Sequence, residues 1–294
     1  MEANAKKLCN FLKSNDSCLI GRNGSLELEV ILFFMHSRSK DIPYPAQMLK
    51  KLELHAGIFP STTTSVDTWC KAYIEALKIC TAVVEGWYAP LASQEIKLHS
   101  LIIPSTTDRI YLRNLEPYYV KPELRWSNYL AEKKVAIINS FAETCVQQTY
   151  LAYGIWGTHY ESILPSSTTW IPIQTYYAPA LAEGKAEWPA HIDSWLDAVQ
   201  YIVQCTLQSE ASVAIIGCGG LGMIIGAELK RNGLQVIVLG GATQILFGIK
   251  GQRWLTHPVI SSFFNNAWTT PPESSIPKGA HKIEGGCYWI KDIK

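Results

Sequence analysis

Residues 213–239 constrain the fold of this chain more than any other segment. The apolar run 213–216 enters a glycine turn at 217–222, a helical pattern follows over 223–231, and a second apolar run occupies 234–239. A strand, a helix and a strand with connections this short form a right-handed crossover, which places both strands parallel in one sheet. The sequence therefore predicts an α/β fold, with a Rossmann-like parallel sheet flanked by helices.

Other segments fit the same architecture. Apolar patterns indicate strands at 17–20 and around 135–138, helices at 3–13, 65–81 and 195–207, and a loop or short strand near 170–173. No repeat, low-complexity tract or long charge run divides the chain. We therefore expect residues 1–294 to form a single domain that ends in a loop-rich tail from about residue 258.

Charge and composition exclude several classes of partner. The 26 Lys and Arg residues against 25 Asp and Glu give a formal net charge of +1, so no global field attracts nucleic acid. No apolar run reaches the roughly 18–20 residues of a membrane span, and the N-terminus lacks a secretory h-region. The eight cysteines form no C-x-x-C pair and are typical of reduced thiols. A cytoplasmic location without nucleic acid or a membrane span is expected, and the oligomeric state stays open.

The glycine turn matches a nucleotide-binding motif in part. Gly217-x-Gly219-x-x-Gly222 after a strand fits the dinucleotide fingerprint, in which backbone N–H groups meet a phosphate at a helix N-terminus. That fingerprint, like the similar turn of adenylating enzymes, expects an acidic residue where the next strand ends, whereas this strand ends at Leu239-Gly240. Phosphate contact and simple tight packing of the helix both remain open.

Two further turns carry charge at expected strand ends. The segment 240–254 holds Lys250 and Arg253 three residues apart, and such groups neutralise a diphosphate or form a solvated basic turn. The segment 21–27 holds Arg22 and Glu27, which either face the same crevice or pair with each other. Ser25 occupies the expected N-cap of the following helix.

Taken together, these motifs resemble a family of bacterial and viral glycosyltransferases with the GT-D fold. The landmarks, in the family's order, are the Arg-x-Gly-x-x-Glu turn at 22–27, Ala-Gly-Ile-Phe-Pro at 56–60, Leu-Glu-Pro-Tyr-Tyr at 115–119, Ser-Phe-Ala-Glu-Thr at 140–144, the glycine turn 217–222, the segment 239–254, and the tail motifs at 266–268 and 284–289. The resemblance covers nearly the whole chain, and the segment 239–254 is its most specific part.

The resemblance implies a GT-D-like sheet, a nucleotide-sugar donor and transfer of the sugar to a hydroxyl of a growing glycan. We call residues 22–27 the front turn. In better-known members of the family the corresponding turn is Arg-x-Gly-Asp-Gly-Glu, and its two carboxylates are tied to a metal ion and the donor diphosphate. Here Ser25 and Leu26 replace the Asp and the second Gly, while Glu27 remains. One carboxylate and one hydroxyl make a poorer site for Mn²⁺ or Mg²⁺ than two carboxylates.

These considerations assign candidate roles. Glu27 is the catalytic base or the contact to the metal or donor, and Glu143, after the strand near 138, is a second candidate base. Trp254 either stacks on a base or sugar ring or belongs to the core. The expected donor-binding residues are Arg22, Gly24, Ser25, Gly219, Gly220, Gly240, Gly241, Gln244, Lys250, Arg253 and Trp254. The rival hypotheses are a nucleotide-binding adenylating or dinucleotide enzyme and a non-catalytic binding member of the same fold.

Overall fold

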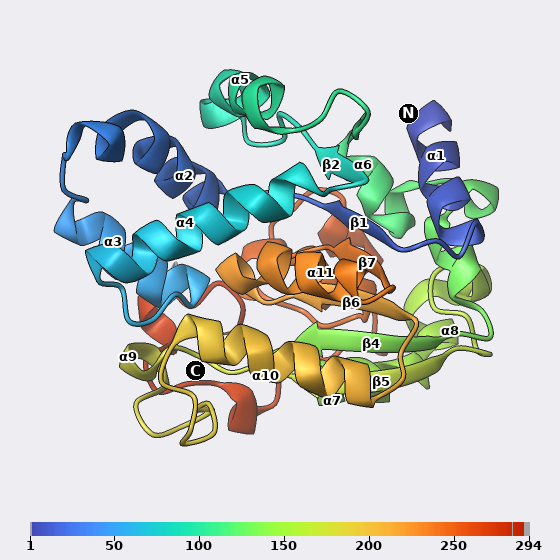
Figure 1. Ribbon diagram of the computed structural model, residues 1–294. Helices are drawn as coiled ribbons and strands as arrows, with labels where there is room; N and C mark the ends of the chain where they lie inside the picture. The colour runs from blue at the N-terminus through green and yellow to red at the C-terminus, as the bar shows by residue number, and fades with distance from the viewer. Residues whose placement is uncertain (1, 284, 291–294) are drawn as a thin grey trace.

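The computed structural model describes residues 2–283 and 285–290, in which seven parallel strands form one sheet (Figure 1). The strand order is β3-β2-β1-β7-β6-β4-β5. The strands are β1 (Cys18–Gly21), β2 (Ala82–Val84), β3 (Asp108–Ile110), β4 (Lys134–Asn139), β5 (Thr169–Gln174), β6 (Val213–Gly217) and β7 (Gln235–Val238). The predicted α/β fold with a Rossmann-like parallel sheet is therefore confirmed.

Helices cover both faces of this sheet. Figure 1 shows α4, α10 and α11 crossing in front of the strands, and the side chains of α1, α7, α8 and α12 join a second core on the opposite face. The helices are α1 (Glu2–Lys13), α2 (Ser25–Ser37), α3 (Ala46–Ala56), α4 (Thr63–Lys78), α5 (Ala92–Ile102), α6 (Leu112–Leu115), α7 (Ala142–Thr149), α8 (Ala152–Trp156), α9 (Pro179–Ala182), α10 (Trp195–Gln208), α11 (Gly222–Arg231) and α12 (Ala242–Leu246). None of the helices in this described part has the length and apolar character that a membrane span requires.

The central strands are apolar because both of their faces are buried. In β4, Ala136 and Ile138 join the core beneath α4, α10 and α11, whereas Val135 and Ile137 join the opposite core. This alternation follows from the two-residue period of a strand, and continuous apolar runs are typical of parallel sheets covered on both sides. The sequence pattern at 135–138 and 213–216 was informative for that reason.

The direction in which successive strands are added to the sheet reverses near its centre. From β1 the chain proceeds to β2 and β3 on one side, whereas β6 leads to β7, which returns to pair with β1. Open α/β sheets bind ligands at the carboxyl ends of strands where the order reverses. The carboxyl ends of β1, β4, β6 and β7 are therefore the place to look for a site.

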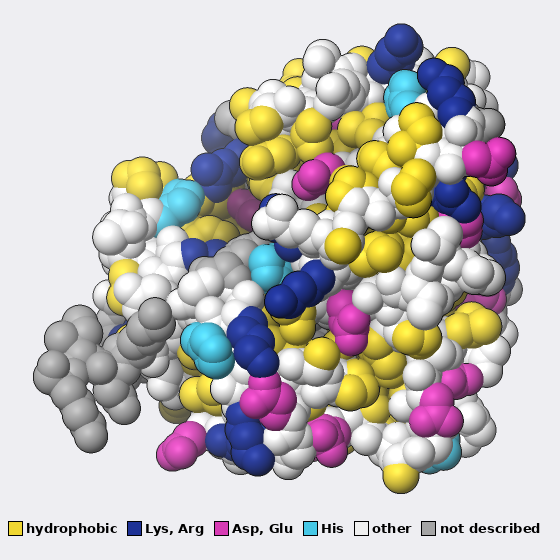
Figure 2. Space-filling view, turned by 90° about the vertical axis from the view of Figure 1, so that its left-hand side faces the viewer, with side chains coloured by type: hydrophobic (Ala, Val, Ile, Leu, Met, Phe, Trp, Pro, Cys, Tyr) yellow, Lys and Arg dark blue, Asp and Glu magenta, His cyan; other side chains and the backbone are white. Residues whose placement is uncertain are grey.

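The structure describes most of the expected C-terminal tail. The single-domain prediction for residues 1–294 stays a prediction, and residue 284 and residues 291–294 of the expected tail lie outside the described residues. Figure 2 shows the face that carries α2 and α3, on which hydrophobic side chains gather and charges of both signs are interspersed.

Candidate functional site

A cavity of about 220 Å³ opens at the carboxyl ends of β1, β4, β6 and β7. It brings the two charged turns and the glycine turn together, although they lie far apart in the sequence. The predicted residues that line it are Arg22, Gly24, Ser25, Glu27, Gly219, Gly240, Gly241, Gln244 and Arg253. Nine residues named from three separate segments therefore meet in one space.

Arg22, directly after β1, places a guanidinium in this cavity. Its Cζ lies 4.5 Å from the centre of the Trp87 ring, which is cation–π distance. Burial lowers the pKa of Arg22, while Glu116 and then Glu27 raise it by Coulombic attraction. A guanidinium stays charged in proteins, so this desolvated cation favours an anionic ligand.

Arg253 brings a second guanidinium from the 3₁₀ turn η8 (Gln252–Trp254). Its Cζ lies 4.1 Å from the centre of the Tyr288 ring and 5.1 Å from that of Trp254. The charge of Arg253 acts to lower the pKa of Arg22, which shows that the two cations repel each other. An anion bound in the cavity would relieve this repulsion.

Two glycines make room for these cations. A Cβ atom at Gly240 would lie 3.1 Å from Arg22 Nε, and one at Gly241 would lie 2.3 Å from Arg253 Nη2. Gly240 also has a φ of +60°, which favours glycine. The glycines after β7 thus leave room for the arginine side chains, and the predicted donor contacts of Gly240 and Gly241 stay predictions.

The front turn differs from its prediction at one residue. Gly24 is the N-cap of α2, with extended φ and ψ angles of −75° and 155°, and Ser25 is the first helical residue, so the prediction of Ser25 as N-cap was wrong. The carbonyl of Gly24 accepts the N–H of Leu28 at 3.0 Å, which fixes this register. The Glu27 side chain folds back over the turn, because a Cβ at Gly24 would lie 1.9 Å from Glu27 Oε2. A carboxylate in this first turn also complements the helix dipole.

Of the two predicted glycine-turn contacts, only Gly219 reaches the cavity. It adopts a φ of +58°, and a Cβ there would lie 2.9 Å from the carbonyl oxygen of Ala56 in α3. Gly220 is buried beneath Ala56 and Ile58, and its carbonyl accepts a hydrogen bond from Trp69 Nε1 at 3.0 Å. Gly220 therefore packs against α3 and α4, and its predicted donor contact stays a prediction.

Besides Gly220, three predicted residues do not line the cavity: Glu143, Lys250 and Trp254. Glu143 is exposed on the first turn of α7. The backbone N–H of Lys250 donates to Thr269 O at 2.7 Å, and its ammonium lies 5.9 Å from the Phe264 ring. Trp254 lies behind the guanidinium of Arg253, and the predicted roles of all three stay predictions.

Sequence reasoning missed Asn139 at the end of β4, which lines the cavity. Its Nδ2 donates to Gly217 O at 2.6 Å, and its Oδ1 accepts the N–H of Phe141 at 2.8 Å. These bonds join the ends of β4 and β6 and shape the start of α7. A polar residue that ends an apolar strand was the available signal.

A buried polar network holds the front turn from behind. Asn23 Nδ2 donates to Glu95 Oε1 at 2.8 Å and to His99 Nε2 at 3.0 Å, and its Oδ1 accepts from Tyr73 Oη at 3.1 Å. The backbone carbonyl of Asn23 accepts Trp87 Nε1 at 2.8 Å. The network therefore positions both the residue after Arg22 and the indole on which Arg22 stacks.

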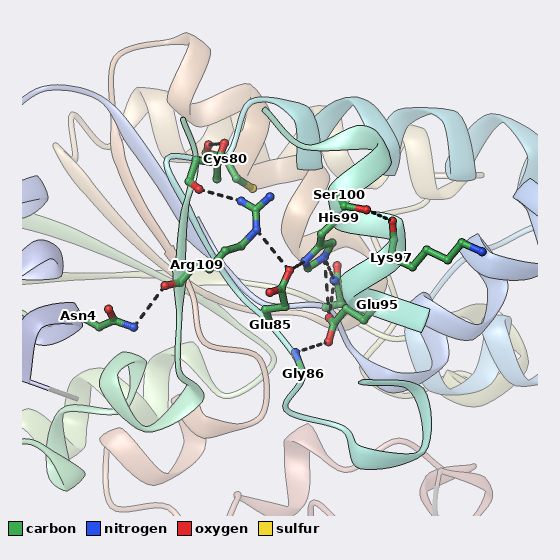
Figure 3. A network of polar contacts seen from close by, with 11 residues as sticks. Asn4, Cys80, Glu85, Gly86, Glu95, Lys97, His99, Ser100 and Arg109 are labelled. Carbon is green, nitrogen blue, oxygen red and sulfur yellow. Dashed lines mark hydrogen bonds and ion pairs between the residues drawn. The ribbon is translucent and has the colours of Figure 1, made fainter. Parts of the chain in front are cut away.

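Figure 3 shows how this network continues through α5 to the edge of the sheet. His99 Nδ1 donates to Glu85 Oε1 at 3.0 Å, which also accepts Arg109 Nε at 3.3 Å, and the N–H of Gly86 donates to Glu95 Oε2 at 2.8 Å. Burial lowers the pKa of His99 and raises that of Glu95. A neutral His99 with its proton on Nδ1 satisfies both of its contacts.

The donor set does not fit a divalent metal ion. No group of three or more His, Cys, Asp or Glu side chains suited to a metal occurs among residues 2–283 and 285–290. Of the described residues that line the cavity, Glu27 alone is a carboxylate, and two guanidiniums share that lining. Mn²⁺ and Mg²⁺ prefer several anionic oxygen ligands and are repelled by neighbouring cations.

Comparisons with known proteins show little similarity. No family model and no curated protein matches the chain. A solved structure described as a selenomethionine-substituted domain of unknown function 1792 is 11% identical, with a TM-score of 0.44 over 83% of this chain and 81% of that chain. The function proposed below therefore rests on the residues of the cavity and on the sequence motifs.

Proposed function

We propose that this protein is a glycosyltransferase that moves a sugar from a nucleotide-sugar donor to a hydroxyl of a glycan. The observation that carries the proposal is the convergence of Arg22 and Arg253 on one cavity at the carboxyl edge of a parallel sheet. Guanidinium groups bind phosphate oxygens with two parallel hydrogen bonds, so a pair of them suits a diphosphate. The resemblance of segments 22–27 and 239–254 to the GT-D glycosyltransferases supports the same class.

The chemistry requires charge stabilisation at two places. As the bond between the sugar and the diphosphate breaks, negative charge grows on the leaving diphosphate, and Arg22 and Arg253 would stabilise it in a partly desolvated site. The acceptor hydroxyl must lose its proton, and Glu27 is the carboxylate at the cavity to receive it. Gly219 would add its backbone N–H to the phosphate contacts.

A ligand screen tests the donor class. We expect UDP-sugars or GDP-sugars to raise the melting temperature of the protein, whereas ATP and NAD leave it unchanged, because only a ligand bound to the folded state stabilises it. Arg22→Met and Arg253→Met should lose the shift, and Arg231→Met, which removes an exposed arginine paired with Glu228, should keep it. A shift by ATP or NAD alone would favour an adenylating or dinucleotide enzyme.

Product analysis tests the reaction. Glu27→Gln keeps the size of the side chain and is expected to lower sugar transfer by about 10²-fold or more, the usual contribution of a general base. Circular dichroism and the melting temperature verify that the variant is folded. Full transfer activity in a folded Glu27→Gln protein would remove Glu27 from the chemistry.

A non-catalytic binding protein is the second candidate, and one observation favours it. Ser25 stands where better-known GT-D members carry an aspartate, so the cavity has half of the expected carboxylate pair. Tight binding of a nucleotide sugar without hydrolysis or transfer, with and without Mn²⁺, would support this candidate over the enzyme.

A further inference from the structure

A second hollow, of about 480 Å³, lies beside the start of the edge strand β5. Its walls come from the end of α7, from α8 and from the segment that leads into β5. The lining residues are Val146, Thr149, Tyr150, Ala152, Tyr153, Tyr160, Pro165, Ser166, Thr168, Thr169 and Trp170. None of them lines the cavity that holds Arg22 and Arg253.

Aromatic rings dominate this hollow, and two of them are unusually exposed. Tyr150 is 85% exposed and Tyr153 is 64% exposed, although both carry large apolar surfaces. The rings of Tyr153 and Tyr160 lie 5.7 Å apart at 85°, so they form two walls of a corner. Trp170 is fixed by an edge contact with Phe247 at 5.5 Å. Aromatic rings open to solvent offer flat apolar surfaces to a ligand.

The remaining lining selects a neutral ligand. Hydroxyl groups of serine and threonine stand beside the rings, and no charged side chain belongs to the described lining. Glu161, which follows the lining residue Tyr160, accepts the N–H of the lining residue Ser166 at 3.0 Å, and this bonding lowers its pKa, so it stays ionised. Flat rings with hydroxyls and one nearby negative charge suit a neutral polyhydroxylated ligand and repel an acidic one.

The position of the hollow separates it from the candidate active site. Thr169 and Trp170 begin β5, whereas the cavity lies at the carboxyl ends of neighbouring strands. Six residues of strand at about 3.3 Å each place the two sites about 20 Å apart. Pro172 in the middle of β5 lacks a backbone N–H, which makes this edge a poor template for a further strand.

We propose that the hollow is a second carbohydrate site that binds a neutral glycan by stacking sugar rings on Tyr150 and Tyr153. That the glycan is part of the acceptor rests on the proposed function, but the binding itself requires no transfer reaction. A long acceptor held here would have a raised effective concentration at the cavity, whereas a short acceptor would gain nothing.

Affinity electrophoresis tests the binding directly. The full chain is run through native gels that contain dextran, amylose or xyloglucan as neutral probes and hyaluronan as an acidic one. At least one neutral polysaccharide should retard the wild type, and Tyr150→Ala combined with Tyr153→Ala should abolish the retardation. Tyr111→Ala is the matched control, because Tyr111 is 61% exposed outside the hollow.

Three results would overturn the proposal. They are no retardation by any neutral probe, equal retardation of the double variant, and retardation by hyaluronan alone. Light scattering adds a fourth, because self-association that the double variant abolishes would assign the hollow to a second copy of the chain. Retardation of a wild type that transfers no sugar would contradict only the proposed enzyme, whereas sugar transfer with unchanged retardation in the double variant would contradict only the second site.

Discussion

At the scale of single residues, the candidate site depends on two glycines, which have no side chain to fill the space beside the arginines. Arg22 and Arg253 reach the cavity because Gly240 and Gly241 leave the space into which the guanidiniums fit. The resulting pair of cations, one of them stacked on Trp87, is the chemical basis of the proposed function. Substitution of these glycines therefore tests the site without removing any charged group.

Gly240→Ala is expected to weaken donor binding, because the new methyl group would lie 3.1 Å from Arg22 Nε and push the guanidinium out of its place against this turn. The positive φ also adds strain of about 1 kcal/mol. Gly233→Ala is the matched control, since Gly233 has a φ of +92° and no neighbour within 4 Å of its added Cβ. Titration calorimetry with the donor should show the loss only at Gly240. Equal donor affinities in the two variants would mean that Arg22 does not contact the donor.

Glu116 gives a prediction about pH. Burial raises its pKa from 4.5 to about 7, although Arg113 and Arg22 oppose the change. Between these pH values the folded state keeps a proton that the unfolded chain has released, so the free energy of unfolding falls as pH rises from about 4.5 to about 7. The loss is on the order of 3 kcal/mol.

Urea unfolding at pH 5 and pH 8 measures this contribution. Glu116→Gln cannot titrate, so the wild type should lose more stability than the variant over that range. Both proteins share the other titrating groups, and the difference between them isolates Glu116. Identical pH dependence would show that Glu116 is ionised throughout.

At the scale of elements, the front turn is held in place by a helix that the sequence analysis did not predict. Helix α5 supplies Glu95 and His99, both fully buried, to the amide of Asn23. Their pairing depends on tertiary contacts between residues more than 70 positions apart, so no local pattern revealed it. By contrast, the strand, glycine turn and helix at 213–231 were predictable, because apolar runs and glycine spacing act locally.

Asn23→Ala is expected to lower the free energy of unfolding by about 2–3 kcal/mol, because buried acceptors on Glu95 and His99 lose their donor. Donor affinity should fall as well, because loss of the side-chain bonds loosens the turn whose backbone carbonyl at residue 23 holds Trp87 beneath Arg22. Chemical denaturation and donor titration measure the two effects. Asn232→Ala, whose amide bonds only the exposed end of α11, should change neither. Unchanged donor affinity in Asn23→Ala would limit the network to a structural role.

At the scale of the whole molecule, the site is a meeting of distant segments at one edge of the sheet. The sequence indicated that the charged turns follow strands, and parallel strands direct such turns to the same edge. It did not indicate that Glu143 and Lys250 lie outside the cavity lining, where Glu143 is exposed and the backbone N–H of Lys250 donates to Thr269, and their predicted roles stay predictions. Which face a loop side chain takes depends on packing that residue spacing does not encode.

The charges of the described cavity lining give a prediction about metal removal, which rests on the proposed transfer activity. Two guanidiniums outnumber one carboxylate in this lining and can neutralise part of the charge of a diphosphate, so EDTA is expected to change sugar transfer less than twofold. Added Mn²⁺ should not raise the rate. Complete loss of transfer in EDTA, restored by Mn²⁺, would show that Glu27 and the donor together hold a metal ion.

The pairing of β1 with β7 has a consequence for folding during synthesis on the ribosome. β1 is made first but lies in the interior of the sheet, and its neighbour β7 begins only at Gln235. Arg22 gains its partner cation later still, when Arg253 leaves the exit tunnel. A nascent chain therefore cannot assemble the cavity until most of it has been translated, and binding of any ligand that needs both arginines would report completion of the last long-range contacts.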